Sequence, residues 1–177
     1  GQGPDADTGG DAQGQPGGDS KGGATPGQKA GIADAKLQVA LSEQIGQGLV
    51  SVETRGEKVF VTVGAGGAFS SGSADLTEEA RQIVEGVKLA TRNGAGQITV
   101  TGHTDDVPLT GSALGDNWGL GAARASAVVR ELTAAGLDPA RMTAVSKGDT
   151  MPLADNTTED GRAKNRRIEI EIDFAQP

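Results

Sequence analysis

The spacing of apolar residues along this chain of 177 residues predicts most of its secondary structure. Five runs have the alternating pattern or the length of β-strands. They span residues 49–54, 57–63, 97–101, 141–147 and 167–174. Arg55-Gly56 separates the first two runs and is typical of a tight turn, so we expect these two strands to form a hairpin.

Two further segments repeat apolar residues at helical spacing. The apolar face of the first consists of Leu76, Ala80, Ile83, Val84 and Val87. Asp75 or Thr77 can serve as its N-cap. The second helix is predicted over 121–135, because Gly136 is a typical residue to end a helix. The sequence 64–67, Gly-Ala-Gly-Gly, lacks the Lys-Ser/Thr ending of a phosphate-binding loop, and we expect a flexible turn there.

The last run separates its apolar and charged residues most cleanly. Its apolar side consists of Ile168, Ile170, Ile172 and Phe174, and its charged side of Arg167, Glu169, Glu171 and Asp173. This alternation is typical of a sheet with one face covered and one face in water. It places Arg167 on the solvent side and Arg166 towards the helices. Together with the order of the elements, it predicts an α/β (α+β) fold, a two-layer sandwich with helices on one face of a mixed sheet.

The first part of the chain divides into two pieces ahead of the domain at 49–177. Residues 1–32 are rich in glycine and proline and poor in large apolar side chains, so we expect a flexible linker. Residues 33–48 carry Leu37, Leu41 and Ile45 at four-residue spacing, with Asp34 as a candidate N-cap, and predict an amphipathic helix. Its apolar stripe could pack on the domain's own sheet or against a second copy of the chain.

Composition excludes several classes of protein. The net charge of −8 and the aromatic content of 2% argue against a nucleic-acid partner, which would need clustered cations or stacking side chains. The absence of cysteine excludes disulfides and thiolate metal sites. No apolar run reaches the ~18–20 residues of a membrane helix. Because the sequence begins at Gly1 without methionine, we expect an anchoring or targeting segment upstream.

Three short stretches carry the candidate chemistry, at 102–106, 120–125 and 165–170. Asp105 follows the predicted strand 97–101, at the kind of strand end where ligands collect in α/β folds. Arg124 lies in the first turn of the predicted helix at 121–135, where its planar guanidinium and free backbone N–H groups favour a carboxylate. A carboxylate and a guanidinium at one rim can hold the ammonium and carboxylate of a small zwitterion. Arg166 can support this loop electrostatically.

Other assignments compete with this one. Asp105 could instead cap a turn, and Arg124 could be an ordinary solvated helix residue. Thr104 and Asn117 could supply loop hydrogen bonds to a ligand. The adjacent Asp105 and Asp106 could suggest acid–base catalysis or a divalent cation, but no further ligands of a cation site follow them. We therefore expect no enzyme activity, no metal and no cofactor.

The lone histidine and the lone tryptophan have structural interpretations. A zinc site with one histidine and no cysteine would be poor, and a catalytic triad would lack a nucleophile. We expect His103 to be a structural hydrogen-bonding residue beside the loop. For Trp118 we expect a place in the core or a role as a lid.

The same three stretches resemble a known family. The patterns T-G-H-T-D, L-x-x-x-R-A and G-R-A-x-N-R-R-I-E-I, in this order, are similar to the OmpA-like peptidoglycan-binding domain over residues 49–174. The longer forms 102–109 and 116–118 resemble its MotB branch, the flagellar stator subunits. The sequence departs from the family at Gly121, where a serine that caps the helix is common. A glycine N-cap costs only a few tenths of a kcal/mol relative to serine.

The resemblance implies a two-layer sandwich and a function without catalysis. It implies that Asp105 contacts the diamino acid of the peptidoglycan stem peptide and that Arg124 holds its carboxylate, with Thr104, Asn117 and Arg166 beside them. It further implies the periplasmic domain of an inner-membrane-anchored bacterial protein, with a MotA-like channel subunit as partner through an upstream segment. Since it also implies that stator wall domains act as pairs, and the stripe at Leu37, Leu41 and Ile45 would suit a second copy, we predict a homodimer. The alternative is the wall anchor of another envelope system, an outer-membrane lipoprotein or a type VI secretion component. A peptidoglycan hydrolase would need an acid–base pair or a zinc site, and neither is visible.

Overall fold

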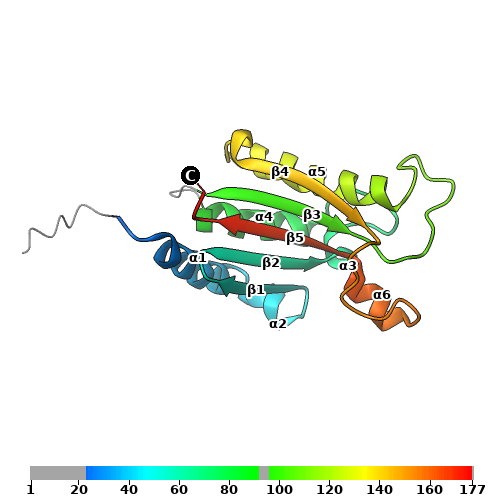
Figure 1. Ribbon diagram of the computed structural model, residues 1–177, viewed down its shortest axis with the longest axis horizontal. Helices are drawn as coiled ribbons and strands as arrows, with labels where there is room; N and C mark the ends of the chain where they lie inside the picture. Colours follow the sequence, from blue (N-terminus) through cyan, green and yellow to red (C-terminus); the bar gives the residue numbers. More distant parts are fainter. Residues whose placement is uncertain (1–22, 92–95, 177) are drawn as a thin grey trace, which may run out of the picture.

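The computed structural model describes residues 23–91 and 96–176, which form a five-stranded sheet with helices packed on one face (Figure 1). The strands are β1 (Val50–Arg55), β2 (Lys58–Gly64), β3 (Gln97–His103), β4 (Met142–Gly148) and β5 (Arg167–Asp173). Their order in the sheet is β1-β2-β5-β3-β4. Among the strands of the described ranges, only β3 and β4 pair in parallel, so the sheet is mixed. The predicted fold class is confirmed.

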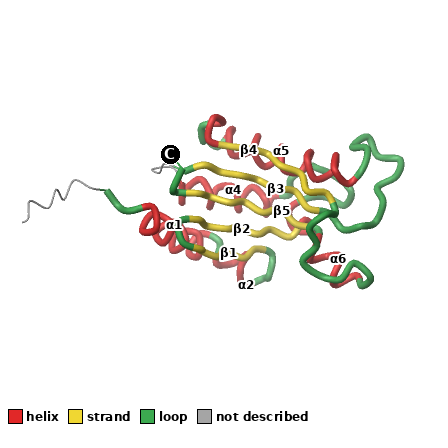
Figure 2. Tube along the Cα trace, in the orientation of Figure 1, coloured by secondary structure: helices red, strands yellow, loops and turns green. Residues whose placement is uncertain are grey.

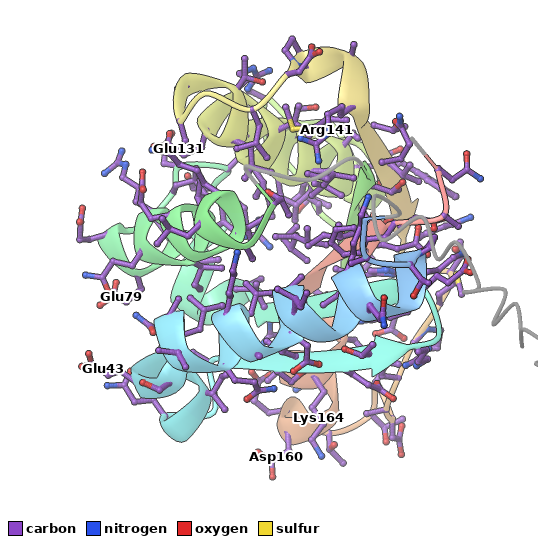
Figure 3. The ribbon with its side chains drawn as sticks, turned by 90° about the vertical axis from the view of Figure 1, so that its left-hand side faces the viewer. Glu43, Glu79, Glu131, Arg141, Asp160 and Lys164 are labelled. Carbon is purple, nitrogen blue, oxygen red and sulfur yellow. The ribbon has the colours of Figure 1, made fainter. Side chains whose placement is uncertain are left out.

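Three long helices cover one face of the sheet (Figures 1, 2 and 3). These are α1 (Pro26–Ala40), α4 (Glu78–Thr91) and α5 (Asn117–Ala134). Four short helical segments complete the described chain: α2 (Ser42–Gly46), α3 (Ala65–Ala68), η1 (Pro139–Arg141) and α6 (Glu159–Asn165). None of the helices in the described ranges combines the length and apolar character needed to cross a membrane.

The core lies between the sheet and these helices. The predicted apolar side of β5 is buried there, with Ile168, Ile170 and Ile172 each almost fully enclosed. Thr77 rather than Asp75 caps α4, because the Thr77 hydroxyl accepts a hydrogen bond from the Ala80 amide. The predicted hairpin is present, with β1 and β2 antiparallel.

Several predicted boundaries are wrong. The first helix begins at Pro26 rather than residue 33, because Thr25 and Gln28 form a reciprocal capping box. Residues 26–32 of the predicted linker are therefore helical, and residues 1–22 lie outside the described ranges. Asp34 does not cap; it accepts a hydrogen bond from the Thr54 hydroxyl on β1. No flexible turn forms at 64–67: Gly64 ends β2 and caps α3, which covers the other three residues.

The helix predicted over 33–48 is divided at Leu41 between α1 and α2, and its apolar stripe packs inside the molecule. Leu37 and Leu41 are completely buried, and Ile45 packs partly against the same core. A Cβ atom added at Gly86 of α4 would lie 2.7 Å from Cδ2 of Leu41, so this glycine lets the two helices approach closely. Since this chain's own core uses the stripe, the homodimer prediction can no longer rest on it.

Candidate functional site

Two glycines bring α5 against β3 and so set where the site residues lie. A Cβ atom at Gly102 would lie 2.1 Å from the carbonyl oxygen of Gly121, and one at Gly121 would lie 2.4 Å from Oγ of Ser146. A side chain at Gly102 would push α5 and β3 apart, and one at Gly121 would displace the Ser146 side chain on β4 and lie 3.0 Å from the Gly102 carbonyl oxygen. Asp105 follows Gly102 by three residues and Arg124 follows Gly121 by three. This close contact therefore fixes the spacing between the two candidate ligand-binding side chains.

Helix α5 begins four residues earlier than predicted, which changes the setting of Arg124. Asp116 is the N-cap, and its carboxylate accepts a hydrogen bond from the Gly119 amide at 2.9 Å. Gly121 is therefore not an N-cap, and the expected cost of lacking serine there does not apply. Arg124 lies in the second turn, away from the free N–H groups of the helix end.

Hydrogen bonds from the backbone and from neighbouring side chains order the loop after β3. The Thr104 amide donates to the carbonyl of Gly148 at 2.8 Å, and the Thr104 hydroxyl donates to the Asp105 carbonyl at 2.8 Å. The Asn117 amide group donates to the carbonyls of Asp105 and Val107, at 3.3 and 3.0 Å. The amide and hydroxyl of Thr104 and the side-chain amide of Asn117 thus hold the loop in place.

The Asp105 carboxylate has two roles. Its Oδ1 accepts a hydrogen bond from the Val107 amide at 3.1 Å, which is the turn-capping role weighed from the sequence. Its Oδ2 lies 2.7 Å from Nη1 of Arg166 and forms an ion pair with it. Arg166 lies between the end of α6 and the start of β5. The Asp105 side chain is only 12% exposed, so this pair is largely shielded from water. This ion pair places Arg166 where it can support the loop electrostatically, as the sequence led us to expect.

Arg166 also contacts Glu159, a residue that the sequence reasoning missed. Its Nη2 lies 2.6 Å from Oε1 of Glu159, in the first turn of α6. Hydrogen bonds to Asp105 first and Glu159 second raise the pKa of Arg166. The only signal in the sequence was the seven-residue spacing of Glu159 and Arg166, and it needed a helix that was not predicted.

Arg124 is buried rather than solvated. It is 5% exposed, its Nε donates to the carbonyl of Ser73 at 2.9 Å, and its guanidinium lies 5.0 Å from the ring centre of Phe69. Burial lowers its pKa, the positive charge of Arg166 lowers it further, and Asp105 opposes both effects. Within the described ranges, no hydrogen bond satisfies its two Nη atoms. The arginine is thus oriented by the protein with part of its donor fork unused.

An open pocket of about 440 Å³ lies beside these cations. Its lining combines both guanidiniums with small residues and one ring: Ala65, Gly66, Phe69, Ser71, Gly72, Arg124 and Arg166. Asp105 adjoins the pocket through its ion pair with Arg166. Two guanidiniums with free or exchangeable donors favour a carboxylate, and Asp105 beside Arg166 is a carboxylate that could receive an ammonium.

A second charged cluster lies on the opposite side of the sheet end. Arg167 is only 3% exposed, so the solvent position predicted from the alternation of β5 is wrong. The segment that follows β4 covers it, and its Nη2 donates a hydrogen bond to the Met151 carbonyl. His103 is also buried, with Nε2 3.4 Å from Oε2 of Glu169. His103 and Arg167 lower the pKa of Glu169 from 4.5 to about 2. The role of this cluster is to join β3 to β5.

Trp118 and Asn165 lie in settings that the sequence did not predict. Trp118 is 51% exposed, so the expected core position is wrong. Asn165, which went unnoticed, is completely buried and makes four hydrogen bonds with Leu153, Ala154 and Asn156. No group of three or more potential His, Cys, Asp or Glu ligands for a metal occurs in the described part of the chain.

The chain is similar to known proteins that share one domain family. The model of the OmpA family matches residues 68–166, more than half of the chain. The chain is 38% identical to Motility protein B of Escherichia coli K12 over 104 residues, covering 58% of this chain and 33% of that protein. Across the first curated relatives it matches, the chain spans between 33% and 45% of their length.

Two solved structures share the fold. The cell wall anchor of the type VI secretion system from Pseudomonas aeruginosa has a TM-score of 0.72 and 36% identity, covering 78% of this chain and 96% of that one. A putative MotB-like protein from Desulfovibrio vulgaris has a TM-score of 0.75 and 26% identity, covering 84% and 93%. The family model that matches more than half of the chain, together with these similarities, shows that the chain belongs to the OmpA family, a non-catalytic family of peptidoglycan-binding domains.

Proposed function

We propose that the domain binds the peptidoglycan stem peptide at the pocket between Arg124 and Arg166. The observation that carries this proposal is the pair of guanidiniums on one pocket, with the buried carboxylate of Asp105 beside them. Arg124 has unused donors for the carboxylate of the diamino acid, and Asp105 can accept hydrogen bonds from its ammonium. Thr104 and Asn117 serve by keeping the Asp105 loop in position.

Co-sedimentation with purified sacculi tests this assignment. Asp105→Asn keeps the size of the side chain but removes the charge of the carboxylate. Arg124→Lys keeps the positive charge but removes the planar fork of the guanidinium. A hydrogen bond to a charged ligand group contributes about 1.5–3 kcal/mol, so we expect each variant to bind roughly tenfold more weakly or worse. Matched controls are Asp106→Asn and Arg130→Lys, both exposed neighbours. If the site variants sediment like their controls, the assignment is wrong.

We further propose that the domain anchors a flagellar stator to the cell wall. Similarity to Motility protein B of Escherichia coli supports this, as does the resemblance of 102–109 and 116–118 to the MotB branch. In that arrangement the domain is periplasmic, an upstream segment anchors it in the inner membrane beside a MotA-like channel subunit, and two copies act together.

The second candidate is a wall anchor of another envelope system. Similarity to the type VI secretion anchor of Pseudomonas aeruginosa, at 36% identity, favours it specifically. A lipoprotein anchor in the outer membrane belongs to the same alternative. Purification of the full-length protein from its own membranes separates the candidates: co-purification with a MotA-type channel subunit supports the stator, and co-purification with secretion components supports the alternative.

A further inference from the structure

Arg166 is shared by two carboxylates that differ strongly in exposure. Its Nη1 contacts Asp105, whose side chain is 12% exposed, at 2.7 Å. Its Nη2 contacts Glu159, whose side chain is 66% exposed, at 2.6 Å. The inner partner adjoins the ligand pocket through this ion pair, and the outer partner lies on α6. One cation therefore has a counter-charge on each side.

Glu159 is itself held in place. Its Oε2 lies 3.1 Å from Nη2 of Arg162, one turn further along α6. Nη1 of Arg162 donates in turn to the carbonyl of Asn156 at 2.9 Å. The Thr158 hydroxyl caps the helix by accepting from the Gly161 amide. An isolated exposed ion pair contributes little, but a network with fixed partners orders the side chain before a ligand arrives.

Ligand binding at Asp105 poses an electrostatic problem. An ammonium that approaches Asp105 competes with the guanidinium of Arg166 for the same carboxylate. If Asp105 were its only partner, Arg166 would lose its counter-charge and also face the positive charge of Arg124 on the same pocket. The exposed carboxylate of Glu159 provides a counter-charge that remains when Asp105 turns to the ligand.

We propose that Glu159 is a positioning residue that keeps Arg166 at the pocket while Asp105 exchanges Arg166 for the ligand ammonium. The freed Nη1 of Arg166 then points to the ligand carboxylate beside Arg124. Glu159 thereby sets the preference for a diamino acid with a free carboxylate over one whose carboxylate is amidated. This inference rests on the proposed binding of stem peptide at the same pocket.

The test compares Glu159→Gln with Asp160→Asn. Asp160 is the next residue in the same first turn, is exposed and points away from the body of the molecule in Figure 3. It forms no ion pair with any residue in the described ranges. Both substitutions remove one negative charge from the start of α6, so they match in their effect on net charge and on the helix end.

Calorimetric titration with two soluble muropeptides gives the readout, one with the free carboxylate on its diamino acid and one with that carboxylate amidated. For the wild type we expect tighter binding of the free form. For Glu159→Gln we expect affinity for the free form to fall roughly threefold, on the scale of an exposed ion pair, and the preference over the amidated form to shrink. Asp160→Asn should retain both the affinity and the preference.

A double variant separates positioning from a purely structural effect. In an Arg166→Gln background, Glu159→Gln should cause no further loss, because its role acts through Arg166. An additive loss, or a Glu159→Gln protein that binds like Asp160→Asn, would overturn the inference. Failure of the binding proposal has a different signature, since Asp105→Asn and Arg124→Lys would then also bind sacculi like their controls.

Discussion

Substitution of Gly102 by alanine tests whether the close contact between β3 and α5 places the binding residues. The added Cβ atom would lie 2.1 Å from the carbonyl oxygen of Gly121, 2.7 Å from its carbonyl carbon and 2.8 Å from its Cα. All three are backbone atoms of a long helix, so no side-chain rotation relieves the overlap. The helix must move away from the sheet by about an ångström or more, since ordinary contact for such a carbon begins near 3.4 Å.

Two effects of opposite sign contribute to the change in stability. Alanine in place of glycine stabilises a strand or helix interior by roughly 0.5–1 kcal/mol, because the unfolded chain loses less freedom. Overpacking a dense core costs about 1–3 kcal/mol and occasionally more. With contacts this short against backbone, overpacking outweighs the gain. We expect a net loss of about 1–3 kcal/mol in the free energy of unfolding, which lowers Tm by roughly 2–4 °C for each kcal/mol.

Gly31→Ala provides the matched control. Gly31 lies within α1, and no atom lies within 4 Å of the Cβ position there. The same chemical change should therefore raise the free energy of unfolding by about 0.5–1 kcal/mol. Urea denaturation of both variants measures these values, and sedimentation with sacculi measures the effect on binding. Because Arg124 moves with α5, Gly102→Ala should also bind more weakly than Gly31→Ala.

The reasoning is refuted if Gly102→Ala unfolds at the same urea concentration as the wild type. That result would mean that the helix has room to accept a methyl group, and the spacing of Asp105 and Arg124 would then need another cause. Lower stability with unchanged binding would refute only the proposed link between this contact and the placement of the binding residues.

Two further predictions concern the segments that surround the site. Asn165→Ala should lower the free energy of unfolding by about 3 kcal/mol or more in urea denaturation, because it leaves the backbone groups of Leu153 and Ala154 without their partner. Glu169, whose pKa is lowered to about 2, should stabilise the fold fully above its unfolded value of 4.5 and lose this contribution as pH falls towards 2. Glu169→Gln should therefore flatten the acid limb of the curve of stability against pH, and a curve equal to that of the wild type would contradict the assignment.

Alternation predicted the core side of β5 because it depends only on neighbours in the sequence. Ile168, Ile170 and Ile172 all lie where their two-residue period places them. The same rule failed for Arg167, which shares its side with Glu169 but is covered by the segment after β4. That cover depends on Asn165, whose four hydrogen bonds join parts of the chain about ten residues apart. Local periodicity contains no information about such a cover.

The candidate site divides in the same way. The residue types and their order predicted Asp105, Arg124 and Arg166 as its charged members, because carboxylates and guanidiniums are the groups that hold a zwitterion. The sequence could not give their pairing. Burial of Arg124 depends on Phe69 and Ser73, some fifty residues away in the chain, and on a helix that begins at Asn117.

The pairing gives the site its chemical character. Arg124 and Arg166 contribute two positive charges, and Asp105 and Glu159 contribute two negative ones, so the four groups around the pocket are balanced before any ligand arrives. A zwitterionic centre adds one charge of each sign and leaves the balance intact, since each of its groups can find an opposite partner. A simple anion would leave a negative excess, and a simple cation would displace Arg166 without filling the space beside Arg124. The arrangement therefore favours a ligand group with both charges on one carbon, such as the free end of a diamino acid.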